Sequence, residues 1–135
     1  MGGIWSDENK YRQWLEVELA ATESLAEAGV VPEQEAHLLL NHAGFKVDRI
    51  LDIEKEVKHD VIAFTTAVAE TMKAAGYGEA SRWFHYGLTS NDVVDTAQAR
   101  QIRQSCELLE KAMERLADSL KRRAYEFKDT VQIGR

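Results

Sequence analysis

The stretch NDVVDTAQARQIRQSCELLEKAMERLADSLKRRAYEF, residues 91–127, decides the fold class. It contains no glycine and no proline, and its apolar side chains recur at intervals of three and four residues, as they do on one face of a helix. These apolar positions are Ile102, Cys106, Leu109, Met113, Leu116, Leu120, Ala124 and Phe127. The pattern predicts one continuous helix that carries the apolar seam of a helical bundle or coiled coil.

The length of this predicted helix exceeds the size of the domain that would carry it. At 1.5 Å per residue the helix is roughly 54 Å long. A compact chain of 135 residues has a radius of gyration of about 14 Å and is therefore only about 37 Å across. The helix must overhang its own domain, and we expect its apolar stripe to be covered by another subunit or by the rest of a longer polypeptide.

Shorter helices are expected in the first part of the chain. Ser6 is a suitable N-cap for a helix that ends at Gly29, a residue type that favours the left-handed position after a helix. The apolar face expected for this helix consists of Trp14, Val17, Ala21 and Leu25. Pro32 fits the first turn of a second helix over residues 33–42.

Two further short helices and one loop complete this region. A third helix is expected over residues 48–56, and a fourth begins at Asp60 and is interrupted at Gly76. Residues 82–88 show no sustained alternation, so we interpret them as an ordered loop. The chain is thus predicted to be all-α: an N-terminal helical domain over residues 1–88 leads into a long helix of a multi-helix bundle, of which residues 89–135 form the start.

The amino-acid composition argues against several classes of function. There are 17 Lys and Arg residues against 23 Asp and Glu, a formal charge of −6 that would repel nucleic acid. No apolar run approaches the roughly 20 residues of a membrane-spanning helix, so no membrane association is expected. A single cysteine, Cys106, allows no intrachain disulfide. We therefore expect a cytoplasmic protein that binds neither nucleic acid nor membrane.

Two polar stretches precede predicted helices: residues 58–60, Lys-His-Asp, and residues 85–92, His-Tyr-Gly-Leu-Thr-Ser-Asn-Asp. Free backbone N–H groups and the helix dipole favour a carboxylate or a phosphate at such positions. The hydroxyl groups of Thr89 and Ser90 would add hydrogen-bond donors. The sequence therefore favours an anionic ligand.

Each of these residues also has an ordinary structural explanation. Thr89 and Ser90 could be plain N-caps, which is the commoner role of such residues before a helix. His59 could be a solvent-facing histidine beside an N-capping Asp60, and His85 could pack against Trp83 or Tyr86. His37 and His42 lie on one short helix without a pattern of metal ligands, so no metal site is expected.

Several segments resemble the adenylosuccinate lyase family, within the fumarase/aspartase superfamily. They are IWSDENKY (residues 4–11), WLEVE (14–18), RILDIE (49–54), KHDVIAFT (58–65) and HYGLTSNDVVDT (85–96), which together extend over nearly the whole chain. The last two, in this order and spacing, distinguish this family from fumarase, aspartase and argininosuccinate lyase. The resemblance implies a fumarase/aspartase-like fold and a homotetramer in which each active site is drawn from three subunits.

The resemblance also implies an activity. The family eliminates fumarate from adenylosuccinate to give AMP, and from SAICAR to give AICAR, without a metal or redox cofactor. Lys58, His59 and Asp60 would line the substrate site, with His59 the catalytic candidate near the nucleotide and the reacting centre. Thr89 and Ser90 would bind a carboxylate of the succinyl group. His85 would be a further contact to the substrate.

Some parts of the family pattern are not found in these 135 residues. Members usually continue beyond Gly134 and Arg135 with a Thr-His pair that supplies the general acid, and a distant mobile loop supplies the base. We therefore expect the N-terminal part of such an enzyme, inactive on its own. The alternatives are a related lyase that acts on another amino-succinate or dicarboxylate, and a non-catalytic helical module that self-associates through the long helix.

Overall fold

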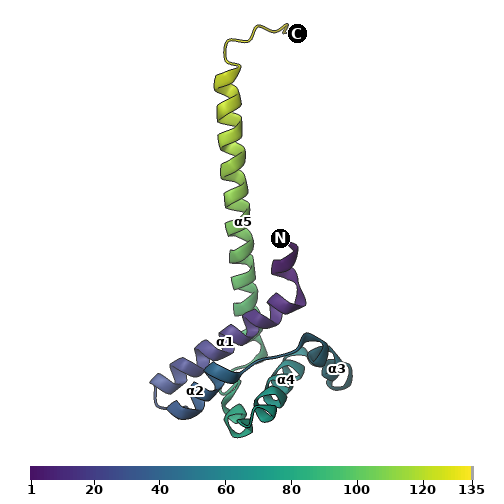
Figure 1. Cartoon of the computed structure of the whole chain (residues 1–135), viewed down its shortest axis with the longest axis vertical. Coiled ribbons are helices and arrows are strands. Elements are labelled where there is room, and N and C mark those ends of the chain that lie inside the picture. Colours follow the sequence, from purple (N-terminus) through teal and green to yellow (C-terminus); the bar gives the residue numbers. More distant parts are fainter. Residues whose placement is uncertain (135) are drawn as a thin grey trace.

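The computed structural model describes residues 1–134, which form only helices and their connections (Figure 1). The five α-helices are α1 (Asp7–Glu27), α2 (Glu33–His42), α3 (Val47–Val57), α4 (Asp60–Ala74) and α5 (Ser90–Glu126). Two short 3-10 helices, η1 (Gly2–Trp5) and η2 (Gly78–Trp83), precede α1 and follow α4. The all-α prediction is confirmed.

The predicted helix ends agree closely with the structure. The Ser6 hydroxyl accepts the backbone N–H of Asn9 at 3.3 Å and so caps α1, as expected. Gly29 follows α1 with a φ of 73°, the left-handed conformation that glycine adopts without steric cost. The bounds of α2 match the prediction, and α3 is one residue longer at each end than residues 48–56.

Three local details differ from the sequence prediction. Pro32 is the extended N-cap residue of α2 and lies before its first turn. Val47 begins α3, one residue before the predicted start. The segment before α5 contains the 3-10 helix η2 up to Trp83, where a loop was expected from residue 82. Its turn is closed by the Ser81 hydroxyl, which donates to the carbonyl of Gly78 at 2.6 Å.

The buried face of α1 is rotated from the predicted one. Trp14 is buried, but Val17, Ala21 and Leu25 are only half-buried. The fully buried positions of α1 are Tyr11, Gln13, Trp14, Glu18 and Thr22. The prediction followed apolar residues alone, whereas α1 also packs polar side chains against α5 and the segment before it.

Aromatic rings from α1 and α4 form the centre of the core. Phe64 is stacked on Tyr11 at 5.9 Å between ring centroids and meets Trp14 edge-on at 5.5 Å. Edge and offset contacts of this kind contribute beyond the burial of their apolar area. The same core contains Leu39 of α2, Ile50 of α3, and residues of α5 near its start. The helices before α5 therefore share one core that holds the N-termini of α4 and α5 in place.

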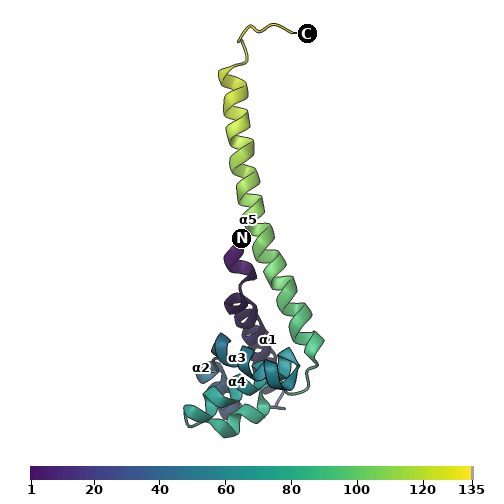
Figure 2. The ribbon, with the colours of Figure 1, turned by 90° about the vertical axis from the view of Figure 1, so that its right-hand side faces the viewer.

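Only the beginning of α5 packs against this core, and the rest extends away from it (Figures 1 and 2). The buried residues of α5 are spaced by four, at Val93, Ala97, Gln101 and Ser105. Every described residue from Cys106 onward is exposed, and Met113 retains 70% of its accessible surface. The expected overhang is confirmed, while the domain division at residue 88 stays a prediction.

Polar contacts set the direction in which α5 leaves the domain. The guanidinium of Arg100 donates to Gln13 of α1 at 2.8 Å and pairs with Glu16. The side chain of Gln101 donates to the carbonyl of Ile4 at 2.7 Å. None of the helices in residues 1–134 is both long and apolar enough to cross a membrane.

Candidate functional site

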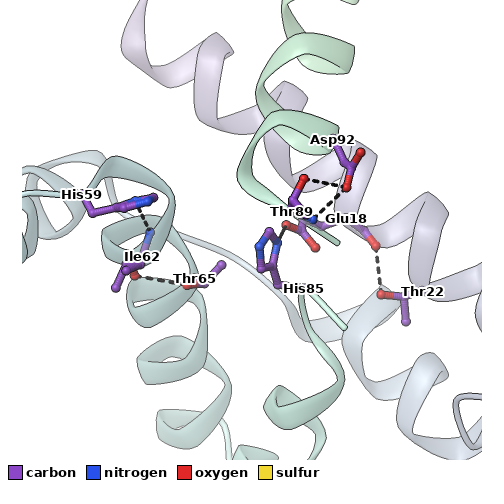
Figure 3. A network of polar contacts seen from close by, with 8 residues as sticks. All are labelled: Glu18, Thr22, His59, Ile62, Thr65, His85, Thr89 and Asp92. Carbon is purple, nitrogen blue, oxygen red and sulfur yellow. Dashed lines mark hydrogen bonds and ion pairs between the residues drawn. The ribbon is translucent and has the colours of Figure 1, made fainter. Parts of the chain in front are cut away.

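The residues predicted to bind substrate lie in two groups, at the N-termini of α4 and α5 (Figure 3). Lys58 and His59 connect α3 to α4, which begins at Asp60, whereas His85 and Thr89 lead into α5, which begins at Ser90. Figure 3 shows His59 of the first group beside the opening turn of α4, and His85 and Thr89 of the second group between α1 and the start of α5. Each group therefore lies where backbone N–H groups are free at a helix start.

His59 is the N-cap of α4. Its Nδ1 accepts the backbone N–H of Ile62 at 3.4 Å, while the carboxylate of Asp60 accepts the N–H of Val61 at 2.8 Å. The alternative in which Asp60 caps the helix is therefore wrong. A neutral imidazole that accepts at Nδ1 carries its proton on Nε2. Because 42% of the His59 side chain is exposed, this N–H is available to a ligand.

Lys58 adopts the left-handed conformation that ends α3, with a φ of 54°. This conformation is uncommon for a residue other than glycine. Its side chain is exposed and borders an open hollow of about 550 Å³ together with Leu51, Glu54 and Lys55. Lys58 thus adds an exposed, positively charged side chain directly before His59 in the chain.

Thr89 and Asp92 form a closed arrangement at the start of α5. Both the backbone N–H and the hydroxyl of Thr89 donate to Asp92 Oδ2, at 2.7 and 2.9 Å. The backbone donor and then the hydroxyl of Thr89 lower the pKa of the Asp92 carboxyl. The hydroxyl proton of Thr89 is engaged in this structure, whereas Ser90 is the half-buried first residue of the helix.

His85 lies against α1. Its Nδ1 is 2.6 Å from Oε1 of Glu18, a residue with no exposed surface. The rings of Trp83 and Tyr86 instead pack on each other, with centroids 5.0 Å apart. His85 also has a positive φ of 63°, so both its backbone and its side chain are held in an uncommon position.

Glu18 was not singled out by the sequence reasoning. The one available signal was its position: it follows Trp14 by four residues, which places a carboxylate on the same face of a helix as a core tryptophan. Burial raises the pKa of Glu18, and the contact with His85 opposes that rise. Its second oxygen, Oε2, is buried without a hydrogen-bond partner in the described part of the chain.

The two groups share no hydrogen bond or ion pair among the described residues. A hollow of about 730 Å³ lies elsewhere, between α2, α4 and η2, and is bordered by Glu35, Lys73 and Tyr77. Within residues 1–134 no cluster of three or more His, Cys, Asp or Glu side chains could hold a metal ion. The candidate site thus consists of two open, polar helix starts.

A sequence model described as lyase matches residues 1–135, and the chain belongs to this lyase family. Among its relatives are two adenylosuccinate lyases. The chain is 47% identical over 135 residues to that of Bacillus subtilis and 44% identical over 135 residues to that of Streptococcus mutans. All of the chain is covered in both cases, but only 30% of each relative.

Solved structures support the same fold. The chain superposes with a TM-score of 0.88 on β-carboxy-cis,cis-muconate cycloisomerase from Acinetobacter calcoaceticus, at 24% identity, covering 99% of the chain and 32% of that structure. A fumarate lyase from Mesorhizobium gives a TM-score of 0.84 at 26% identity, covering 98% of the chain and 31% of that structure. The predicted fumarase/aspartase-like fold class is confirmed.

Proposed function

We propose that the chain is part of an enzyme that eliminates fumarate from adenylosuccinate to give AMP, and from SAICAR to give AICAR, in purine biosynthesis. The observation that carries this proposal is the 47% identity to an adenylosuccinate lyase over the entire chain. The chain spans about 30% of the length of the curated relatives it matches, so the activity would belong to the whole polypeptide.

The reaction requires three kinds of group. A base removes a proton next to a carboxylate, donors stabilise the negative charge that develops, and an acid protonates the departing nitrogen. The helix starts of α4 and α5 are suited to the second requirement, because their backbone N–H groups and dipoles favour anions. We assign this chain the binding and orientation of the anionic groups of the substrate.

Each predicted residue takes a role that suits its surroundings. The exposed Nε2–H of His59 would donate to the substrate near the reacting centre, which makes His59 the catalytic candidate of the chain. The Lys58 ammonium would add positive charge, and Asp60 would accept a donor of the nucleotide. Ser90 and Thr89 would hold a succinyl carboxylate, for which Thr89 must release its hydroxyl from Asp92. His85 would contribute a further hydrogen bond.

We further propose that the general acid and the general base are supplied by other parts of the polypeptide or by other subunits. His59 and His85 lie in separate groups, and the Nδ1 atom of each is already occupied by a contact within the chain. A substrate whose anionic group is held at one helix start would still need a base that removes the proton from carbon and an acid that protonates the departing nitrogen. The isolated chain would therefore lack lyase activity.

Self-association through α5 follows from the same proposal. The apolar residues Leu109, Met113, Leu116 and Leu120 are each more than half exposed on one side of α5. Apolar stripes of this extent are rarely left bare on a monomer. We propose that they meet the corresponding helices of other subunits in a cytoplasmic homotetramer, with no metal or redox cofactor and with neither nucleic acid nor membrane as a partner.

The second candidate is a related lyase of the same superfamily. The solved relatives are a muconate cycloisomerase and a fumarate lyase, so the fold alone does not select adenylosuccinate. A non-catalytic assembly module is disfavoured because such a module does not need polar groups such as Lys58-His59-Asp60 at exposed helix starts.

Fumarate release by the full-length polypeptide tests the proposal. Adenylosuccinate, SAICAR, argininosuccinate and aspartate would be compared as substrates at equal concentration. We expect turnover with the first two alone. Preferred turnover of argininosuccinate or aspartate would identify the related-lyase alternative, and no turnover with any of the four would contradict the proposed function.

A further inference from the structure

Glu18 and His85 form a buried contact that the predicted roles do not explain. The two residues are 67 positions apart, and Glu18 Oε1 lies 2.6 Å from His85 Nδ1 (Figure 3). The Glu18 side chain has no exposed surface, whereas 25% of the His85 side chain is exposed. The occupied nitrogen of His85 therefore faces the interior, and only Nε2 remains for a ligand.

The surroundings of Glu18 strongly disfavour an uncompensated negative charge. Its second oxygen has no hydrogen-bond partner among the described residues. A buried carboxylate that is neither paired nor fully hydrogen-bonded is expensive, so such groups either pair with a cation or take up a proton. We therefore expect the Glu18–His85 pair to have no net charge near neutral pH.

A pair without net charge contains two exchangeable protons. One lies between Oε1 and Nδ1, because two bare acceptors would not approach to 2.6 Å. The other must then be on Nε2 of His85. This holds whether the first proton belongs to the carboxyl group or to the imidazole, since both arrangements leave Nε2 protonated.

We propose that Glu18 is a positioning residue that keeps Nε2 of His85 protonated, so that His85 donates a hydrogen bond to a carboxylate or phosphate of the substrate and does not act as a base. The identity of that substrate rests on the proposed function. The placement of the proton does not, because it follows from the burial of Glu18 and the geometry of the pair.

Asp92 is a second acidic group whose charge interacts with that of His85. It accepts both donors of Thr89 at the start of α5, so its charge is already stabilised there. Among residues 1–134, Glu18 is the residue that makes a hydrogen bond with the imidazole. The effects of Glu18 and Asp92 on His85 can therefore be distinguished by substituting each residue in turn. We expect the protonation of His85 Nε2 to change when Glu18 is substituted.

The direct test is the protonation of His85 in the unsubstituted full-length polypeptide. Nitrogen-15 labelling of the histidines and solid-state NMR distinguish protonated from bare ring nitrogens, and His85→Gln identifies the signals of His85 by their loss. We expect a protonated Nε2 near neutral pH. A bare Nε2 would overturn the proposal, and this measurement requires no substitution at Glu18.

Kinetics of Glu18→Gln give a second test. Glutamine is nearly isosteric but cannot share a proton with the imidazole, so His85 keeps one proton that can occupy either nitrogen. We expect part of Nε2 to become bare, with KM for adenylosuccinate rising about tenfold, the scale of one hydrogen bond to a charged group. Unchanged His85 signals and an unchanged KM in this variant would contradict the proposal.

Thr22→Val is the matched control. Thr22 is buried one turn further along α1, and its hydroxyl donates to the backbone carbonyl of Glu18 at 2.8 Å. This substitution perturbs the same buried turn without altering the carboxylate, so KM and the His85 signals should not change. A protonated Nε2 in a polypeptide that releases no fumarate would refute the proposed function and leave the effect of Glu18 on His85 intact.

Discussion

His59 caps α4 with one imidazole nitrogen while its side chain stays 42% exposed: Nδ1 accepts the backbone N–H of Ile62 at 3.4 Å. The cap and the proposed chemistry therefore belong to different atoms of one side chain. A substitution that retains the helix cap and removes the group proposed to contact the substrate would separate the structural role of His59 from its functional role.

His59→Ala in the full-length polypeptide should lower turnover by about a hundredfold or more, the usual contribution of an acid–base or orienting histidine. Assembly should be intact, because the side chain lies outside the core. Steady-state kinetics and sedimentation measure the two effects.

His59→Asn is the control for the helix cap, since asparagine is among the preferred N-cap residues. We expect His59→Asn to recover the stability lost in His59→Ala, at most about 1 kcal/mol, without recovering turnover. Near-normal turnover in either variant would show that His59 only caps α4 at the surface and has no role in the reaction.

Thr89→Ala and Ser90→Ala should weaken substrate binding and turnover more than stability. Loss of a helix cap alone costs about 1 kcal/mol. Thr89→Ser retains the hydroxyl that donates to Asp92 and serves as the matched control. Thermal melts and KM would be measured on the same preparations. A large fall in melting temperature with normal activity per folded molecule would show that these residues are caps only.

The 135-residue chain should fold as helices, self-associate and show no fumarate release. Sedimentation at tens of micromolar would detect the association. Leu109→Glu and Met113→Glu place charges on the exposed stripe and should yield a monomer, because burying an unpaired charge opposes association.

Lys111→Glu adds the same residue type on a different side of α5 and should leave self-association unchanged. A strictly monomeric parent chain would contradict the role of the stripe. Turnover close to that of the full-length polypeptide would assign acid–base chemistry to His59 or His85.

Alkaline pH should destabilise the fold through Tyr11. Burial, and then the negative charges of Glu54, Asp7 and Asp60, raise the pKa of Tyr11 from 10.0 to about 12. Because the folded state disfavours the phenolate, its stability is fully present below pH 10 and is lost as the pH rises from 10 towards 12.

Tyr11→Phe should remove part of this alkaline sensitivity, as followed by circular dichroism during chemical denaturation. Tyr125→Phe is the control, because Tyr125 is 68% exposed. Equal slopes of stability against pH in the two variants would show that Tyr11 ionises without resistance from the fold.

The helices could be predicted because their signals are local. Ser6, Gly29 and Gly76 mark ends through the conformation of a few neighbouring bonds, and the spacing of apolar residues in α5 depends only on the helical repeat. The extent of η2 was missed because a 3-10 turn has no comparable repeat over six residues. The sequence indicated a helix start near Lys58, His59 and Asp60, but which of the three caps α4 depends on side-chain geometry.

By itself the sequence determined the helical class, most helix bounds and the presence of polar groups at two helix starts. Only the tertiary structure decided which partner each polar group meets. Glu18 and His85 are 67 residues apart, and their contact exists because α1 packs against α5, which His85 precedes by a few residues. Helical periodicity indicates which side of a helix is apolar, because it depends only on residues close in the sequence. The role of a buried carboxylate depends on the distant residue with which it shares a proton, and only the tertiary structure identifies that residue.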